Sequence, residues 1–125
     1  MYFSDQEKKS ILKGFISIFD RIANKEYQKR IWIRGEGPEC DDFDDTVCDF
    51  FGECDSILEN YKSYKITESQ YLLLKKFRDE FQIFSDENDL PQEFIDTSEW
   101  AKVIEMAKEI LKAFGYKKVD LNKDA

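Results

Sequence analysis

Carboxylates are the side chains of this sequence that could do chemistry, because histidine is absent and only three cysteines occur among 125 residues. The lack of histidine removes the commonest general base, the commonest zinc ligand and every Ser-His or Cys-His nucleophile. Cys40, Cys48 and Cys54 have no CxxC spacing, which is typical of unpaired thiols in a reducing cytosol. Acid–base catalysis, metal binding and charge recognition by Asp and Glu are therefore what remains.

The metal-binding patterns in this sequence are incomplete. The run from Asp41 to Asp45 has the DDxxD spacing of magnesium–diphosphate sites, but the enzymes that use this motif are far larger. An EF-hand loop starting at Asp42 would need glycine where Val47 stands, and one starting at Asp86 has Leu90 at its fifth position. We therefore predict no metal site, no cofactor and no catalytic residue.

The charges are segregated along the chain, and its net charge of −8 repels nucleic acid and anionic membranes on average. Residues 35–61 contain ten acids and residues 79–101 contain eight, and neither stretch contains Lys or Arg. The remainder holds all 19 Lys and Arg against nine acids. A uniform solubility coat does not require this separation, so the acids predict a basic protein partner rather than nucleic acid or a membrane.

Length and composition predict one all-α domain that spans residues 1–125. The length suits a single core, and only five glycines and two prolines argue against a turn-rich all-β chain. No run of 18 apolar residues occurs, and the N-terminus lacks the basic start and apolar stretch of a secretory signal. We therefore expect a cytoplasmic protein.

Apolar residues at three-and-four spacing predict four amphipathic helices, over residues 5–22, 42–61, 68–84 and 97–114. Ser4 with Glu7 and Thr67 with Gln70 have capping-box spacing, and Asp96 with Glu99 imitates it. Residues 24–34 could be a short helix or an extended segment, 85–91 are expected to be a polar loop, and 116–125 a frayed tail. Helices joined by such short loops predict a compact bundle of four main helices.

The second predicted helix carries a stripe of acids opposite its apolar face. At 100° per residue, its outward positions hold carboxylates with small residues at the middle. They are Asp42, Asp45, Asp49, Gly52, Ser56 and Glu59, flanked by Asp44, Glu53 and Asp55. Acids in the first turn favour the helix dipole, but that benefit has faded at Asp49 and beyond.

The spacing of these acids is unfavourable for an isolated helix. Asp45 and Asp49 are like charges four residues apart, as are Asp49 and Glu53, and Asp55 and Glu59. Each such pair destabilises a helix by roughly 0.2–0.5 kcal/mol. Two explanations stay open at this point, which are a cationic partner and internal pairing with Lys or Arg from other helices. We favour the partner.

With these features the chain resembles the small, acidic, helical immunity proteins of bacterial toxin systems, in particular those of contact-dependent growth inhibition. The resemblance rests on size, charge and helix pattern, and on two segments. They are Cys40-Asp41-Asp42-Phe43-Asp44-Asp45-Thr46-Val47-Cys48-Asp49-Phe50-Phe51 and Tyr61-Lys62-Ser63-Tyr64. It implies a cytoplasmic protein that binds one incoming toxin domain and blocks it. Toxins of this family are often nucleases, whose clefts are basic because they hold phosphates.

A toxin-binding role assigns contact residues and no chemistry. We expect a protein that is monomeric when free and that binds a basic toxin domain of the nuclease class through its acidic face. The predicted charged contacts are Asp42, Asp45, Asp49, Asp55 and Glu59. Tyr61 and Tyr64 are predicted aromatic anchors, since aromatics beside acids suit a basic partner. Glu87, Asp89 and Glu93 form a predicted second acidic patch.

Two other function classes are kept as alternatives. The chain also resembles the MazG-like magnesium-dependent nucleotide pyrophosphohydrolases, which are small and helical and pair ExxE with a later ExxD. Glu36 and Glu39 supply the first spacing inside a Gly-Pro loop, but Ser56 stands where an acid should follow Glu53. The other alternative is an acidic adaptor or DNA mimic that inhibits a host nucleic-acid enzyme.

Overall fold

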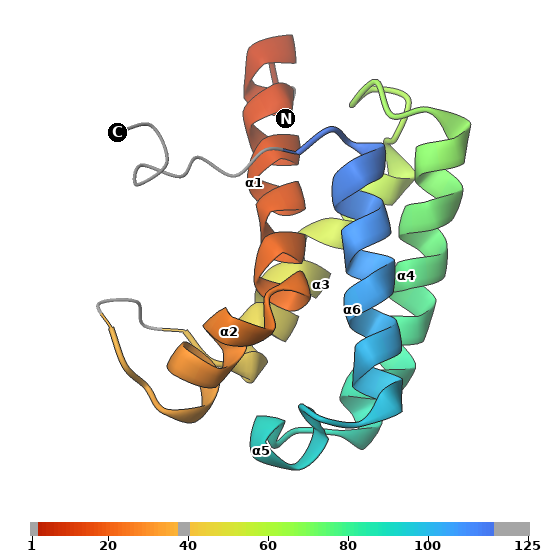
Figure 1. Cartoon of the computed structure of the whole chain (residues 1–125). Helices are drawn as coiled ribbons and strands as arrows, with labels where there is room; N and C mark the ends of the chain where they lie inside the picture. Colours follow the sequence, from red (N-terminus) through yellow and green to blue (C-terminus); the bar gives the residue numbers. More distant parts are fainter. Residues whose placement is uncertain (1–2, 38–40, 117–125) are drawn as a thin grey trace.

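The computed structural model describes residues 3–37 and 41–116, and within these ranges it is helical and contains no strand (Figure 1). Four long helices are joined by short helical segments, which confirms the predicted all-α class. The long helices are α1 (Asp5–Ala23), α3 (Phe43–Glu59), α4 (Glu68–Glu87) and α6 (Ser98–Ala113). The short segments are α2 (Lys25–Tyr27), the π-helix η1 (Gln28–Ile33) and α5 (Pro91–Phe94).

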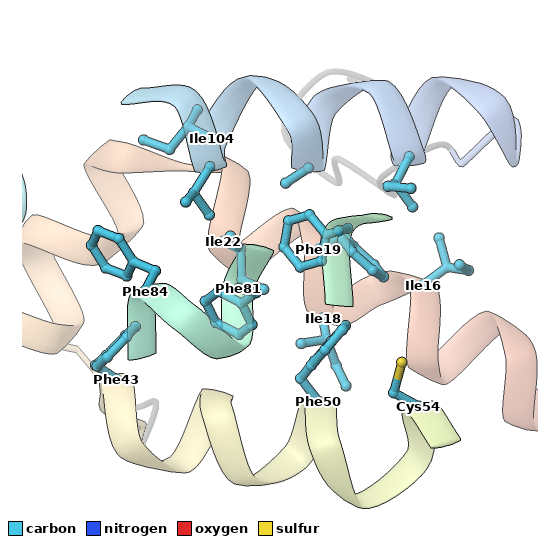
Figure 2. Close-up of a cluster of buried hydrophobic side chains, with 14 of the residues drawn as sticks. Ile16, Ile18, Phe19, Ile22, Phe43, Phe50, Cys54, Phe81, Phe84 and Ile104 are labelled. Carbon is cyan, nitrogen blue, oxygen red and sulfur yellow. The ribbon is translucent and has the colours of Figure 1, made fainter. Parts of the chain in front are cut away.

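The four long helices pack as a ring around one aromatic core. Both α1 and α4 pack against α3 and against α6, so the α1–α3 side of the ring lies opposite the α4–α6 side. Phe19 of α1 lies inside, with its ring centroid 5.6 Å from that of Phe50 of α3 and 4.8 Å from that of Phe77 of α4. Figure 2 shows Phe43, Phe50 and Cys54 projecting from α3 into this cluster.

The helix ends follow local capping chemistry. Both predicted capping boxes are present, Ser4 with Glu7 at α1 and Thr67 with Gln70 at α4. The third was wrong, because the side chain of Thr97, not of Asp96, accepts the hydrogen bond that starts α6. Asp96 instead forms an ion pair of 2.8 Å with Lys25, which lowers the pKa of the Asp96 carboxyl.

Several boundaries differ from the sequence prediction. Within 24–34, residues 25–33 are helical, so the short-helix alternative is confirmed over the extended one, and their π-helical part closes with the Arg34 amide donating to the Lys29 carbonyl at 3.1 Å. Residues 85–91 are not one loop, because α4 continues through Glu87 and Pro91 begins α5. Proline suits that first helical position because the backbone N–H that it lacks would have no hydrogen-bond partner within the helix there.

A residue with left-handed backbone conformation follows each of the helices α3 and α6. Gly115 follows α6 with a φ of 63°, the left-handed conformation that favours glycine just past a helix end. After α3, the chain makes a further turn and Lys65 takes the equivalent position with a φ of 59°. The Ile66 amide then donates to the Tyr61 carbonyl at 3.0 Å, and the Ile66 side chain is buried. Residues 117–125, most of the predicted tail, lie outside the described residues.

Within the described ranges, none of the helices combines the length and the apolar character that crossing a bilayer requires.

Candidate functional site

The acidic stripe of α3 faces solvent, as its helical spacing predicts. The buried face of α3 consists of Phe43, Thr46, Phe50, Cys54 and Ile57. The exposed residues on the other side, apart from Cys48, are Asp42, Asp44, Asp45, Asp49, Gly52, Glu53, Asp55, Ser56 and Glu59. We call this set the α3 stripe. Asp42 is its N-cap rather than a helical residue, because its side chain accepts from the Asp45 amide at 2.7 Å.

On the α1 side of the stripe, Arg21 supplies a positive charge that the sequence spacing did not reveal. Its two terminal nitrogens reach Asp41 at 3.1 Å and Asp49 at 3.2 Å. The expectation that the stripe has no counter-charge from its own chain is therefore wrong at Asp49. The Asp49 side chain nevertheless remains 56% exposed, so the ion pair is a solvent-screened one and leaves the carboxylate accessible.

On the α4 side of the stripe, Arg78 supplies a positive charge to Asp55. The Nε atom of Arg78 donates to Asp55 at 2.9 Å, and a terminal nitrogen contacts Asp79 of its own helix at 3.3 Å. The guanidinium lies 5.9 Å from the ring centroid of Phe51, which holds it against α3. The sequence expectation is wrong here too, although the Asp55 side chain is 60% exposed.

The middle and both ends of the stripe hold carboxylates that form no ion pair with another described residue. Among the described residues, Asp44, Asp45, Glu53 and Glu59 have no ion pair. The pKa of Asp45 is raised above its ordinary value, first by the nearby charge of Asp42 and then by partial desolvation and the other acids around it. The raised pKa of the Asp45 carboxyl reflects the like charges gathered at this end of α3.

Asp41, directly before the stripe, is an internal residue instead. Its side chain is only 8% exposed. The Oδ2 atom accepts from the Tyr27 hydroxyl at 2.8 Å and from the Trp32 indole at 2.9 Å, and the Thr46 hydroxyl donates at 3.1 Å. With Arg21 on its other oxygen, Asp41 ties α1, α2, η1 and α3 together. The first aspartate of the DDxxD run, Asp41, is therefore used in holding the fold together.

Gln28 is the second internal polar residue that positions these elements. It is fully buried, and its amide donates to the carbonyls of Arg21 at 2.9 Å and Ile22 at 2.7 Å, at the end of α1. Its oxygen accepts from the Trp100 indole of α6 at 2.9 Å. The π-helical start at Gln28 thus closes α1 and orients Arg21 beside α3. Gln28, like Asp41, was missed because a polar residue in sequence gives no sign of its long-range partners.

The two predicted aromatic anchors differ in their surroundings. Tyr61 is half-buried and its ring centroid lies 4.3 Å from that of Tyr71 of α4, at the end of α3. Tyr64 is half-buried too, but it lines a groove with Lys8, Lys9 and Lys65, so it lies beside cations rather than in the α3 stripe. A partner role for either ring remains a prediction.

The predicted second acidic patch lies at the far end of α4. Glu87 closes that helix, Asp89 follows it in the connection, and Glu93 belongs to α5. All three side chains are exposed. Glu87 also lines the groove between α4 and α6.

A groove of about 480 Å³ runs between α1 and the α3 stripe. Its walls include Gly14 of α1 and Gly52 of α3, and its floor includes Ile11 and Phe15. A Cβ atom added at either glycine would meet no atom within 4 Å, and neither has a positive φ. Since glycine costs a helix interior roughly 0.5–1 kcal/mol, both are unfavourable residues that the fold itself does not need.

The remaining chemistry-bearing residues do not form a reactive centre among the described residues. No cluster of three or more His, Cys, Asp or Glu in residues 3–37 and 41–116 has the geometry to hold a metal ion. Cys54 is buried, which raises the pKa of its thiol to about 12, whereas Cys48 is exposed in the α1–α3 groove. Cys40 and Glu39 lie outside the described residues.

Comparisons of this chain with protein families, with characterised proteins and with solved structures found no match.

Proposed function

We propose that this protein is a toxin-neutralising immunity protein that acts in the bacterial cytoplasm. It binds a basic toxin domain of the nuclease class through the α3 stripe and blocks it, without performing chemistry itself. The observation that carries this proposal is the set of exposed carboxylates at Asp45, Glu53 and Glu59, which form no ion pair with any described residue although two arginines lie on the flanks of the same helix.

The stripe has dimensions that suit a nucleic-acid cleft. Glu59 lies fourteen positions after Asp45, which corresponds to about 21 Å along a helix. That length is about the rise of six base pairs of DNA. Carboxylates spaced along it can occupy the positions of backbone phosphates in the cleft and exclude the substrate by charge.

The α1–α3 groove gives the same surface a shape that a partner can fill. The two glycines let a partner element approach the helix backbones, and Ile11 and Phe15 offer apolar area beneath. A long Lys or Arg of the toxin can lay its alkyl stem on this floor and direct its charge to Glu53 at the rim. The interface then combines shape with charge, as specific complexes require.

The decisive experiment reverses the unpaired charges and measures protection. Asp45→Lys with Glu59→Lys should abolish the protection of cells that express the cognate toxin domain. Folding should survive, because both side chains are exposed and neither has an ion pair among the described residues. Asp49 is left unchanged in this variant, since a lysine there would face Arg21 and disturb α1.

The control is Glu105→Lys with Glu109→Lys on α6, which lies across the ring from α3, and the one described ion pair that it removes is the exposed contact of 3.5 Å between Glu105 and Lys108. This variant has the same net charge, and it should protect cells as the wild type does. Equal protection by both variants would remove the α3 stripe from the interface. Loss of protection in both would show that net charge, not this surface, matters.

A further inference from the structure

A second groove, of about 510 Å³, lies between α4 and α6 on the side of the ring opposite the α1–α3 groove. In Figure 1 these two helices run side by side. The floor of this groove is apolar and includes Phe84, Val103 and Met106. Phe84 and Val103 belong to the core, so the groove opens directly onto the interior packing of the bundle.

The wall that α4 contributes carries an apolar side chain that the fold does not cover. Ile83 is 58% exposed at this groove. Leu72, which is 59% exposed, lies eleven residues earlier, so it projects within about 20° of the same direction on α4. Leu72 lies about 16 Å away along the helix axis, so Ile83 is the residue that adds exposed apolar area to the groove itself, next to Phe84, Val103 and Met106.

The rim of the groove is anionic. Glu80 and Glu87 of α4 and Glu99 of α6 line it, against the single cation Lys102. Among the described residues, none of these four side chains takes part in an ion pair. The exposed acids Asp89 and Glu93 continue the negative charge beyond the end of α4.

We propose that the α4–α6 groove binds a cationic amphipathic helix of a protein partner. Such a helix places apolar side chains on Ile83 and the groove floor, and Lys or Arg at the glutamates of the rim. A second copy of this chain is disfavoured as the occupant, because it would bring the same three glutamates towards each other. This surface is separate from the α3 stripe, so the proposal holds whether or not the protein neutralises a toxin.

The test uses a labelled amphipathic peptide of Leu and Lys, with leucines at three-and-four spacing, and measures binding by fluorescence anisotropy. Ile83→Ser should weaken binding about tenfold, the effect of truncating a central anchor. Glu80→Gln with Glu87→Gln should also weaken it and reduce its salt dependence. Ile33→Ser is the matched control, since Ile33 is 38% exposed but lies at the end of η1.

The α3 stripe is the competing site for a cationic peptide, so a second variant separates the two surfaces. Asp45→Asn with Glu59→Gln should leave peptide affinity unchanged, and peptide-induced amide shifts should fall in residues 80–88 and 99–106. Absent binding, an unaffected Ile83→Ser variant or shifts confined to α3 would overturn the proposal. A dimer of the free protein that Ile83→Ser dissolves would overturn it too, by assigning the groove to a second copy.

Discussion

At the scale of single residues, environment separates aspartates that are adjacent in sequence. Asp41 accepts hydrogen bonds from Tyr27 and Trp32 and pairs with Arg21, whereas Asp44 is exposed and has no ion pair among the described residues. Replacing Asp41 by Asn should lower the free energy of unfolding by about 2–4 kcal/mol, because a buried network loses its charge. Urea denaturation measures this. Asp44→Asn should change stability little, and equal losses in both variants would contradict the structural role of Asp41.

The Asp45 carboxyl reports the repulsion within the stripe. Its raised pKa means that the folded protein holds this proton more tightly than the unfolded chain does. The stability that protonated Asp45 contributes is therefore complete below the ordinary pKa and is lost as pH rises through the raised folded pKa. Asp42→Asn should lower the pKa of Asp45, because Asp42 is the largest cause of the shift and Asn preserves the N-cap. Carboxyl carbon NMR titration measures it, and an unchanged Asp45 midpoint would refute this cause.

At the scale of secondary-structure elements, local patterns predicted most of the fold and little of the site's electrostatics. The apolar spacing and two capping boxes predicted the long helices, because these signals depend on neighbours within one turn. The pairing of Arg21 with Asp49 and of Arg78 with Asp55 joins residues 28 and 23 positions apart, so no local pattern contains it. The π-helix and α5 were missed for the same reason, since Gln28 bonds to Trp100 and Phe94 packs in the core.

The helix α3 is the element in which stability and binding should respond in opposite directions. Gly52→Ala should raise the free energy of unfolding by about 0.5–1 kcal/mol, because alanine favours the helix and its Cβ meets no atom. The same methyl group would occupy the α1–α3 groove and should weaken the proposed toxin complex. Thermal unfolding and a binding titration measure the two effects. A more stable variant that binds the toxin unchanged would exclude the groove from the interface.

At the scale of the whole molecule, acidic and basic side chains are not evenly mixed over the surface. Exposed acids gather on α3 and at the α4–α6 groove, while Lys8, Lys9 and Lys65 line the groove beside Tyr64. A field of this kind orients the molecule during encounter as well as attracting a basic partner. The net charge alone cannot orient the molecule, because orientation depends on where the charges lie on its surface. The rate of association is therefore a better measure of the stripe than affinity is.

The association rate with the toxin domain should fall steeply as salt rises, because charge steering is screened over about 8–10 Å. Asp45→Asn with Glu59→Gln should slow association and flatten that dependence, with a smaller effect on dissociation. Glu105→Gln with Glu109→Gln removes the same charge from α6 and should leave both rates close to those of the wild type. Stopped-flow mixing at several salt concentrations measures these rates. If the two double variants slowed association equally, the net charge would account for steering and the α3 stripe would have no special part in it.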